Sequence, residues 1–200
     1  MVLHGPAPWT GLRAVGRGLR GDVRVLVLTG SWPADAADAD HDDDVDWLDR
    51  ADLLSIAVLD GPTQGVGLSI ALACDLRVVS ERTELSFPEA QRGWVAQGSA
   101  VSSLVAVLGR SRALELCVTG RVMGASEARL LGLVNLVVPA AELAAATDDL
   151  VTAVLSAPRD ALIETKALLD GAAARGRGTQ CEAGRDARAR LLRSRDELAD

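Results

Sequence analysis

The sequence predicts an α/β fold with a helical C-terminal region. Four continuous runs of β-branched residues and Leu, at 23–29, 54–59, 76–79 and 133–138, are typical of strands that are covered on both faces. Apolar segments of helical length lie between these runs and after them. Strands that alternate with helices favour helices packed in layers on a largely parallel sheet.

The C-terminal third of the chain reads as helix alone. Pro158 suits the first turn of a helix, where the missing N–H of proline is not needed. A last amphipathic helix at 181–198 would need a partner surface. We therefore predict an α/β core, residues 1–140, and a helical region, residues 141–200, which form one functional unit. The other predicted helices lie at 65–74, 98–108, 111–118, 126–131, 141–156 and 159–174.

The stretch 55–75 joins a strand to a helix through a glycine-rich turn. The run 56–59 predicts a buried strand, a turn is expected at 60–62, and Gly65 and Gly67 then open an apolar helix. The first N–H groups of a helix have no partner within it, and the helix dipole is positive there. Such a turn can hold a developing negative charge, including the oxyanion of an enolate. Alternatively, the glycines only shape the strand-to-helix turn.

Composition excludes several classes of function. The 200 residues suit one domain, and they carry a formal net charge of −7. This acidity disfavours non-specific binding to nucleic acid or to anionic membranes. No apolar stretch is long enough for a membrane span and no signal peptide is visible, so we expect a cytoplasmic location. Cys74 and Cys117 lie in apolar runs and are interpreted as small buried hydrophobes.

One segment is strongly acidic, since residues 35–49 include eight Asp. Asp38, Asp40, Asp42 and Asp49 match four ligand positions of a Ca²⁺-binding loop, but the loop's required glycine is absent. We interpret the segment as a solvated loop and expect no metal site.

Seven motifs follow one another along the chain in a fixed order. They are V-R-V-L-V-L-T-G at 23–30, A-D-A-D at 37–40, I-A-V-L-D-G-P-T-Q-G-V-G at 56–67, A-C-D-L-R-V-V at 73–79, F-P-E-A-Q-R-G at 87–93, L-G-R-S-R-A-L-E-L-C-V-T-G at 108–120 and E-A-R-L-L-G-L-V-N-L-V-V-P at 127–139. In this order they resemble the crotonase superfamily, the enoyl-CoA hydratase/isomerase family. The resemblance implies a crotonase-type ββα spiral core with a helical C-terminal region.

By this resemblance, the backbone N–H groups of Ala39 and Val66 form an oxyanion hole for a thioester carbonyl. Gly65 and Gly67 flank Val66 and would let the ligand approach the backbone closely. Asp38 stands where the family usually has a glycine, so the Ala39 amide would point elsewhere if Asp38 cannot adopt the glycine conformation. Loss of one such donor costs about 3 kcal/mol of transition-state stabilisation in other enzymes.

Asp40 and Trp47 are also expected at the substrate. Asp40 ends the turn that carries Ala39. The acidic segment is shorter than the corresponding part of the family, which normally adds a helix over the acyl pocket. Trp47 is expected to supply part of the missing cover.

Glu89 matches one catalytic carboxylate of the family's hydratases and isomerases. An apolar pocket would raise its pKa by desolvation and suit it to proton transfer. Alternatively, it is a glutamate at a helix start, where the dipole favours it. Ser69, six residues before Asp75, stands where the hydratases carry their second Glu. Its hydroxyl cannot act as a base without activation, so it would donate a hydrogen bond or leave room.

The resemblance implies a lyase or isomerase of fatty acid metabolism that acts on acyl-CoA or enoyl-CoA thioesters. Coenzyme A would be part of the substrate, and no separate cofactor is expected. Isomerase-like proton transfer is favoured over efficient hydration, because one carboxylate suffices for it. Two alternatives remain, namely a non-catalytic acyl-CoA-binding homologue and a partner subunit of a larger assembly. The resemblance also implies a homo-oligomer, either a trimer or a dimer of trimers.

Overall fold

A mostly parallel, curled β-sheet organises the chain in the computed structural model, which describes residues 2–4, 12–32, 45–96 and 99–197. Five strands run parallel in the spatial order β1-β2-β3-β4-β7. A short strand β5 pairs with the end of β3, and β6 pairs antiparallel with β5. The strands are β1 (Val2–His4), β2 (Val25–Trp32), β3 (Leu54–Gln64), β4 (Leu76–Ser80), β5 (Glu84–Ser86), β6 (Met123–Gly124) and β7 (Leu136–Val138).

Strand β3 is the central strand, and it is longer than its sequence predicts. The turn expected at 60–62 is wrong, because the strand continues through these residues to Gln64. Up to Leu59 the strand pairs with β4, and from Pro62 onward it pairs with β5. Gly61, with a φ of 105°, lies at this change of partner. The D-G-P signal therefore marks a bend between two strand pairings, not the end of the strand.

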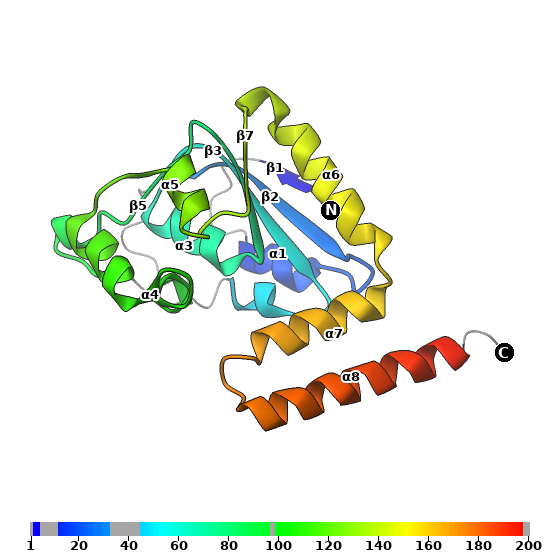
Figure 1. Cartoon of the computed structure of the whole chain (residues 1–200). Helices are drawn as coiled ribbons and strands as arrows, with labels where there is room; N and C mark the ends of the chain where they lie inside the picture. Colours follow the sequence, from blue (N-terminus) through cyan, green and yellow to red (C-terminus); the bar gives the residue numbers. More distant parts are fainter. Residues whose placement is uncertain (1, 5–11, 33–44, 97–98, 198–200) are drawn as a thin grey trace.

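Helices cover both faces of the sheet (Figure 1). Successive residues of β2 alternate between two cores: Leu26 and Leu28 belong to one hydrophobic cluster, Val25 and Val27 to the other. The first cluster packs under α1, α3, α4 and α5, and the second packs under α6. These helices are α1 (Leu12–Gly18), α3 (Gly65–Ala73), α4 (Ser99–Thr119), α5 (Ala125–Leu130) and α6 (Leu143–Ser156).

The predicted helices are confirmed. The range labelled α4 holds two helices that meet at a kink at Gly109, where the backbone is not helical, as the separate predictions for 98–108 and 111–118 require. After the short turn η4 (Ala140–Glu142), the remaining described elements are helices joined by short connections, and α7 (Arg159–Asp170) and α8 (Arg177–Glu197) lie side by side (Figure 1). No helix in the described parts of the chain has the length and apolar character that crossing a bilayer requires.

Lys166, the single lysine of the chain, ties helix α7 to the core. Its Nζ donates to the backbone carbonyls of Leu48 and Leu53 at 3.0 and 2.9 Å, and lies 2.9 Å from Oδ1 of Asp75. Oδ2 of Asp75 also accepts hydrogen bonds from the backbone N–H and the hydroxyl of Ser55, at 2.7 and 2.9 Å. Because Asp75 lies two residues after the last residue of α3, the same carboxylate fixes the C-terminal end of that helix.

Replacing Lys166 with Met keeps an unbranched apolar stem but removes the charge. Since the lysine side chain is only 10% exposed, the substitution leaves Asp75 without its cation and two carbonyls without their donor. We expect the free energy of unfolding to fall by about 3 kcal/mol, measured by urea titration with circular dichroism.

The matched control is Arg190→Met, which breaks the pair between Arg190 and Glu164 that joins α8 to α7. The arginine side chain is 52% exposed, so solvent screens the pair and its loss should cost much less than the loss of Lys166. Equal costs for the two variants would contradict the assignment of Lys166 as the main tie.

Candidate active site

Strand β3 passes into helix α3 through Gly65, with no intervening loop. The φ of Gly65 is 51°, in the left-handed region that favours glycine. Val66 follows in the first turn of α3, where backbone N–H groups have no partner within the helix. The fold therefore presents helix-start amides, which have no partner within α3, at the end of the central strand.

Glu89 lies against this turn. The buried Phe87 follows strand β5 and anchors the chain, and Glu89 then opens the short turn η3 (Ala90–Arg92). Oε1 of Glu89 lies 3.0 Å from the point where a Cβ on Gly65 would stand. The backbone conformation at position 65 favours glycine, and a Cβ there would also force the Glu89 carboxylate to shift by a few tenths of an ångström.

The Glu89 carboxylate is incompletely satisfied. Its Oε2 is buried, and within the described residues it has no hydrogen-bond partner. Burial raises the pKa of Glu89, while a backbone hydrogen bond and the nearby Arg92 cation act in the opposite direction. A carboxyl group with a raised pKa and an unused oxygen is suited to receive and return a proton.

Ser69 lies one helical turn after Gly65 and contacts the same turn from within the helix. Its Oγ donates a hydrogen bond of 3.1 Å to the Gly65 carbonyl. The hydroxyl proton is thus used by the helix backbone, and only the oxygen lone pairs remain for a ligand.

An apolar cavity of about 360 Å³ lies beside Glu89, between the η3 turn and helix α4. Its walls include Trp94, Val95, Leu114 and Cys117. Burial, and then the negative charge of Glu89, raise the pKa of the Cys117 thiol, which places the cavity wall within electrostatic reach of the carboxylate. The sequence analysis did not predict this cavity. A signal in the sequence was the apolar pair Trp94-Val95, which closely follows the Pro-Glu motif. In the structure these two residues are 53% and 74% exposed.

The remaining predicted site residues lie elsewhere or outside the described residues. Gly67 is buried in the first turn of α3. Trp47, in the turn η2 (Asp46–Asp49), packs its indole against Gly16 of α1. Ala39 and Asp40 lie outside the described residues. The roles of these residues at a substrate stay predictions.

Acidic side chains do not assemble into a metal site in the part of the chain that the structure describes. There, no group of three or more His, Cys, Asp or Glu could hold a metal ion. Asp38, Asp40 and Asp42 of the acidic segment fall outside the described residues.

A family model described as enoyl-CoA hydratase/isomerase matches residues 21–197. The enoyl-CoA isomerase/hydratase fer4 of Mycosarcoma maydis is 34% identical over 93 residues, which are 46% of this chain and 34% of that protein. The peroxisomal fatty acid beta-oxidation multifunctional protein MFP2 of Arabidopsis thaliana is 37% identical over 98 residues, 49% of this chain and 14% of that protein. The match to this chain thus spans about a third or less of these curated relatives.

Solved structures share the fold over nearly the whole chain. A Thermobifida fusca YX protein assigned as an enoyl-CoA hydratase, crystallised in complex with acetoacetyl-CoA, superposes with a TM-score of 0.87 at 33% identity. The superposition covers 93% of this chain and 84% of that chain.

The raised pKa of Glu89 predicts a pH-dependent effect on stability. Its carboxyl group binds a proton more readily in the folded than in the unfolded chain, so protonation favours the folded state below the unfolded pKa. That contribution is lost as the pH rises through the raised folded pKa. We therefore expect Glu89→Gln to melt at a higher temperature than wild type at about pH 8 and at the same temperature at about pH 3.5, measured by scanning calorimetry. The control is Glu81→Gln, at an exposed position, and an equal gain there would contradict the prediction.

Proposed function

This chain belongs to the enoyl-CoA hydratase/isomerase family, and on that premise we propose that it binds an acyl-CoA thioester at the Gly65 turn and moves a proton with Glu89. The observation that carries the proposal is the contact between the Glu89 carboxylate and Gly65, because it joins a proton carrier to helix-start amides. Coenzyme A is then part of the substrate, and no further cofactor takes part.

In the proposed reaction, the Val66 N–H donates to the carbonyl oxygen of the thioester. A second donor, the Ala39 N–H, would complete the oxyanion hole. Glu89 takes a proton from C2 of a 3-enoyl thioester, and the electron pair moves onto the carbonyl oxygen to give a dienolate. The dienolate then takes the proton back at C4, so that the double bond ends between C2 and C3.

Isomerisation is proposed over efficient hydration, because Ser69 replaces a second carboxylate. Water addition needs one group to activate the water and another to supply a proton. The Ser69 hydroxyl already donates to the Gly65 carbonyl, which supports a structural role for it. A single carboxylate can carry out both proton transfers of the isomerisation.

The cavity beside Glu89 supports an apolar acyl group. Most of its walls are aliphatic or aromatic, and a hydrocarbon chain attached to the reacting carbons would displace water there. We also propose a homo-oligomer. Leu169 in α7 and Leu192 in α8, 69% and 50% exposed, are apolar residues that a neighbouring subunit could cover.

A non-catalytic acyl-CoA-binding protein is the second candidate. The commitment of Ser69 to the helix backbone leaves Glu89 as the sole proton carrier among the described residues at the turn, so binding without chemistry follows if Glu89 alone does not turn over an enoyl thioester.

Turnover of enoyl thioesters separates the two candidates. We expect wild type to isomerise a 3-enoyl-CoA faster than it hydrates a 2-enoyl-CoA, and Glu89→Gln to lose about 10²- to 10⁴-fold in isomerisation rate. Acyl-CoA affinity, measured by titration calorimetry, should stay unchanged in the variant, because the backbone donors remain. Glu81→Gln serves as the control for loss of one carboxylate elsewhere. Wild-type binding without turnover would establish the non-catalytic candidate instead.

A further inference from the structure

We propose that Gln91 is a positioning residue for Glu89, because it holds the turn that carries the carboxylate against the end of helix α4. The inference rests on the proposed function of Glu89 and goes beyond it, since Gln91 touches neither the Gly65 turn nor the cavity.

The turn that begins at Glu89 has a shape fixed by its own backbone. The Glu89 carbonyl accepts hydrogen bonds from the N–H groups of Arg92 and Trp94, both at 2.9 Å, and Gly93 adopts the left-handed conformation between them. These bonds are internal to the turn, so they do not determine where the turn sits on the core. That placement depends on its anchors to other elements.

One anchor is Phe87, which is 1% exposed in the core just before Glu89. On the other side, Nε2 of Gln91 donates a hydrogen bond of 2.7 Å to the carbonyl of Val118, near the end of α4. Within the described residues, this is the side-chain hydrogen bond that links the turn to α4. In the described structure, Glu89 therefore lies between a buried ring and a turn that one side-chain hydrogen bond joins to α4.

The absence of a side chain at Gly120 leaves room for the Gln91 amide. A Cβ at position 120 would overlap the Gln91 amide group, and the φ of Gly120 is 59°, which also favours glycine. A side chain at position 120 would therefore force the Gln91 amide to move.

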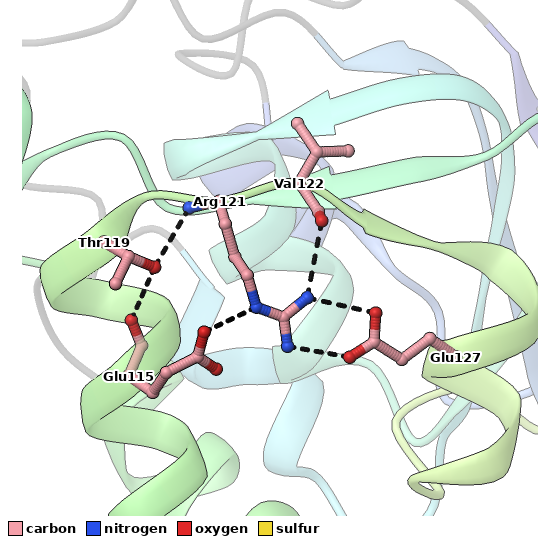
Figure 2. A network of polar contacts seen from close by, with 5 residues as sticks. All are labelled: Glu115, Thr119, Arg121, Val122 and Glu127. Atoms are coloured by element: carbon pink, nitrogen blue, oxygen red, sulfur yellow. Dashed lines mark hydrogen bonds and ion pairs between the residues drawn. The ribbon is translucent and has the colours of Figure 1, made fainter.

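A network of polar contacts surrounds the end of α4, as Figure 2 shows. Arg121 donates to Glu115 of α4 at 2.6 Å and to both carboxylate oxygens of Glu127 in α5, at 3.0 and 2.7 Å. Thr119 donates to the Glu115 carbonyl at 2.8 Å and accepts from the Arg121 N–H at 3.3 Å. Gln91 thus attaches the turn to a point that two helices and an arginine hold in place.

Loss of this anchor should affect Glu89 in a specific way. A turn that moves on the core admits water to the carboxylate, and greater hydration lowers a pKa that burial had raised. A purely structural role for Gln91 would change the melting temperature and leave this pKa where it is.

The test compares Gln91→Ala with Gln180→Ala in the full chain. Gln180 makes the same kind of bond, from Nε2 to the Leu168 carbonyl at 3.1 Å, in the C-terminal helices. We expect Gln91→Ala to lower the pKa of Glu89, measured by carbon-13 NMR titration of its carboxyl group, with the signal identified from Glu89→Gln. It should also lower kcat for a 3-enoyl-CoA about tenfold with KM nearly unchanged, and move the acid limb of the pH–rate profile to lower pH. Gln180→Ala should change none of these.

A second variant, Gly120→Ala, tests the fit. It should lower kcat more in the wild-type background, where it displaces the Gln91 amide, than in Gln91→Ala, where only the backbone strain at position 120 remains. Additive losses would overturn the proposed fit.

The outcomes separate the two proposals. An unchanged Glu89 pKa and pH profile in Gln91→Ala overturns the positioning role, even where Glu89→Gln is inactive. A wild type without turnover overturns the catalytic proposal, and the NMR titration alone then decides the placement of Glu89 by Gln91.

Discussion

The left-handed backbone of Gly65 lets the central strand become a helix without a loop, and the arrangement of the candidate site depends on it. Any side chain there would both strain the backbone and displace the Glu89 carboxylate. At its other end, the same helix is followed by Asp75, which Lys166 and Ser55 hold. Helix α3 is therefore fixed at both ends, and its first amides have a defined direction.

Buried polar groups differ in how completely they are satisfied. Arg77, 8% exposed, donates to the carbonyls of Leu133, Ala71 and Cys74 at 2.6, 3.2 and 2.7 Å. The dipoles of these carbonyls stabilise its positive charge, and the hydrogen bonds join α3 to the segment before β7. Glu89 instead keeps one oxygen buried and unpaired within the described structure. A group left unsatisfied at a conformationally restricted turn is expected where stability is exchanged for function.

The two parts of the candidate site belong to different kinds of structural element. The amides of the Gly65 turn belong to the sheet and its central helix, whereas Glu89 sits on a short turn beside a cavity with exposed apolar walls. Gln91 braces that short turn against the end of α4, where the arginine-centred network lies. The sequence carries no local pattern for such a brace, since a glutamine after Pro-Glu-Ala is ordinary by composition.

Local patterns determined the order of elements and the type of site. Periodicity predicted four parallel strands and the helices, and the Gly65–Gly67 turn and the Pro-Glu motif marked the residues around which the site forms, because these depend on neighbours along the chain. Only the tertiary structure decided that β3 runs through residues 60–62, since β5 supplies its new partner there. Packing alone brought Glu89 to Gly65, Gln91 to Gly120 and Lys166 to Asp75, because contacts between distant segments follow from how helices settle on the sheet and leave no periodic trace in the sequence.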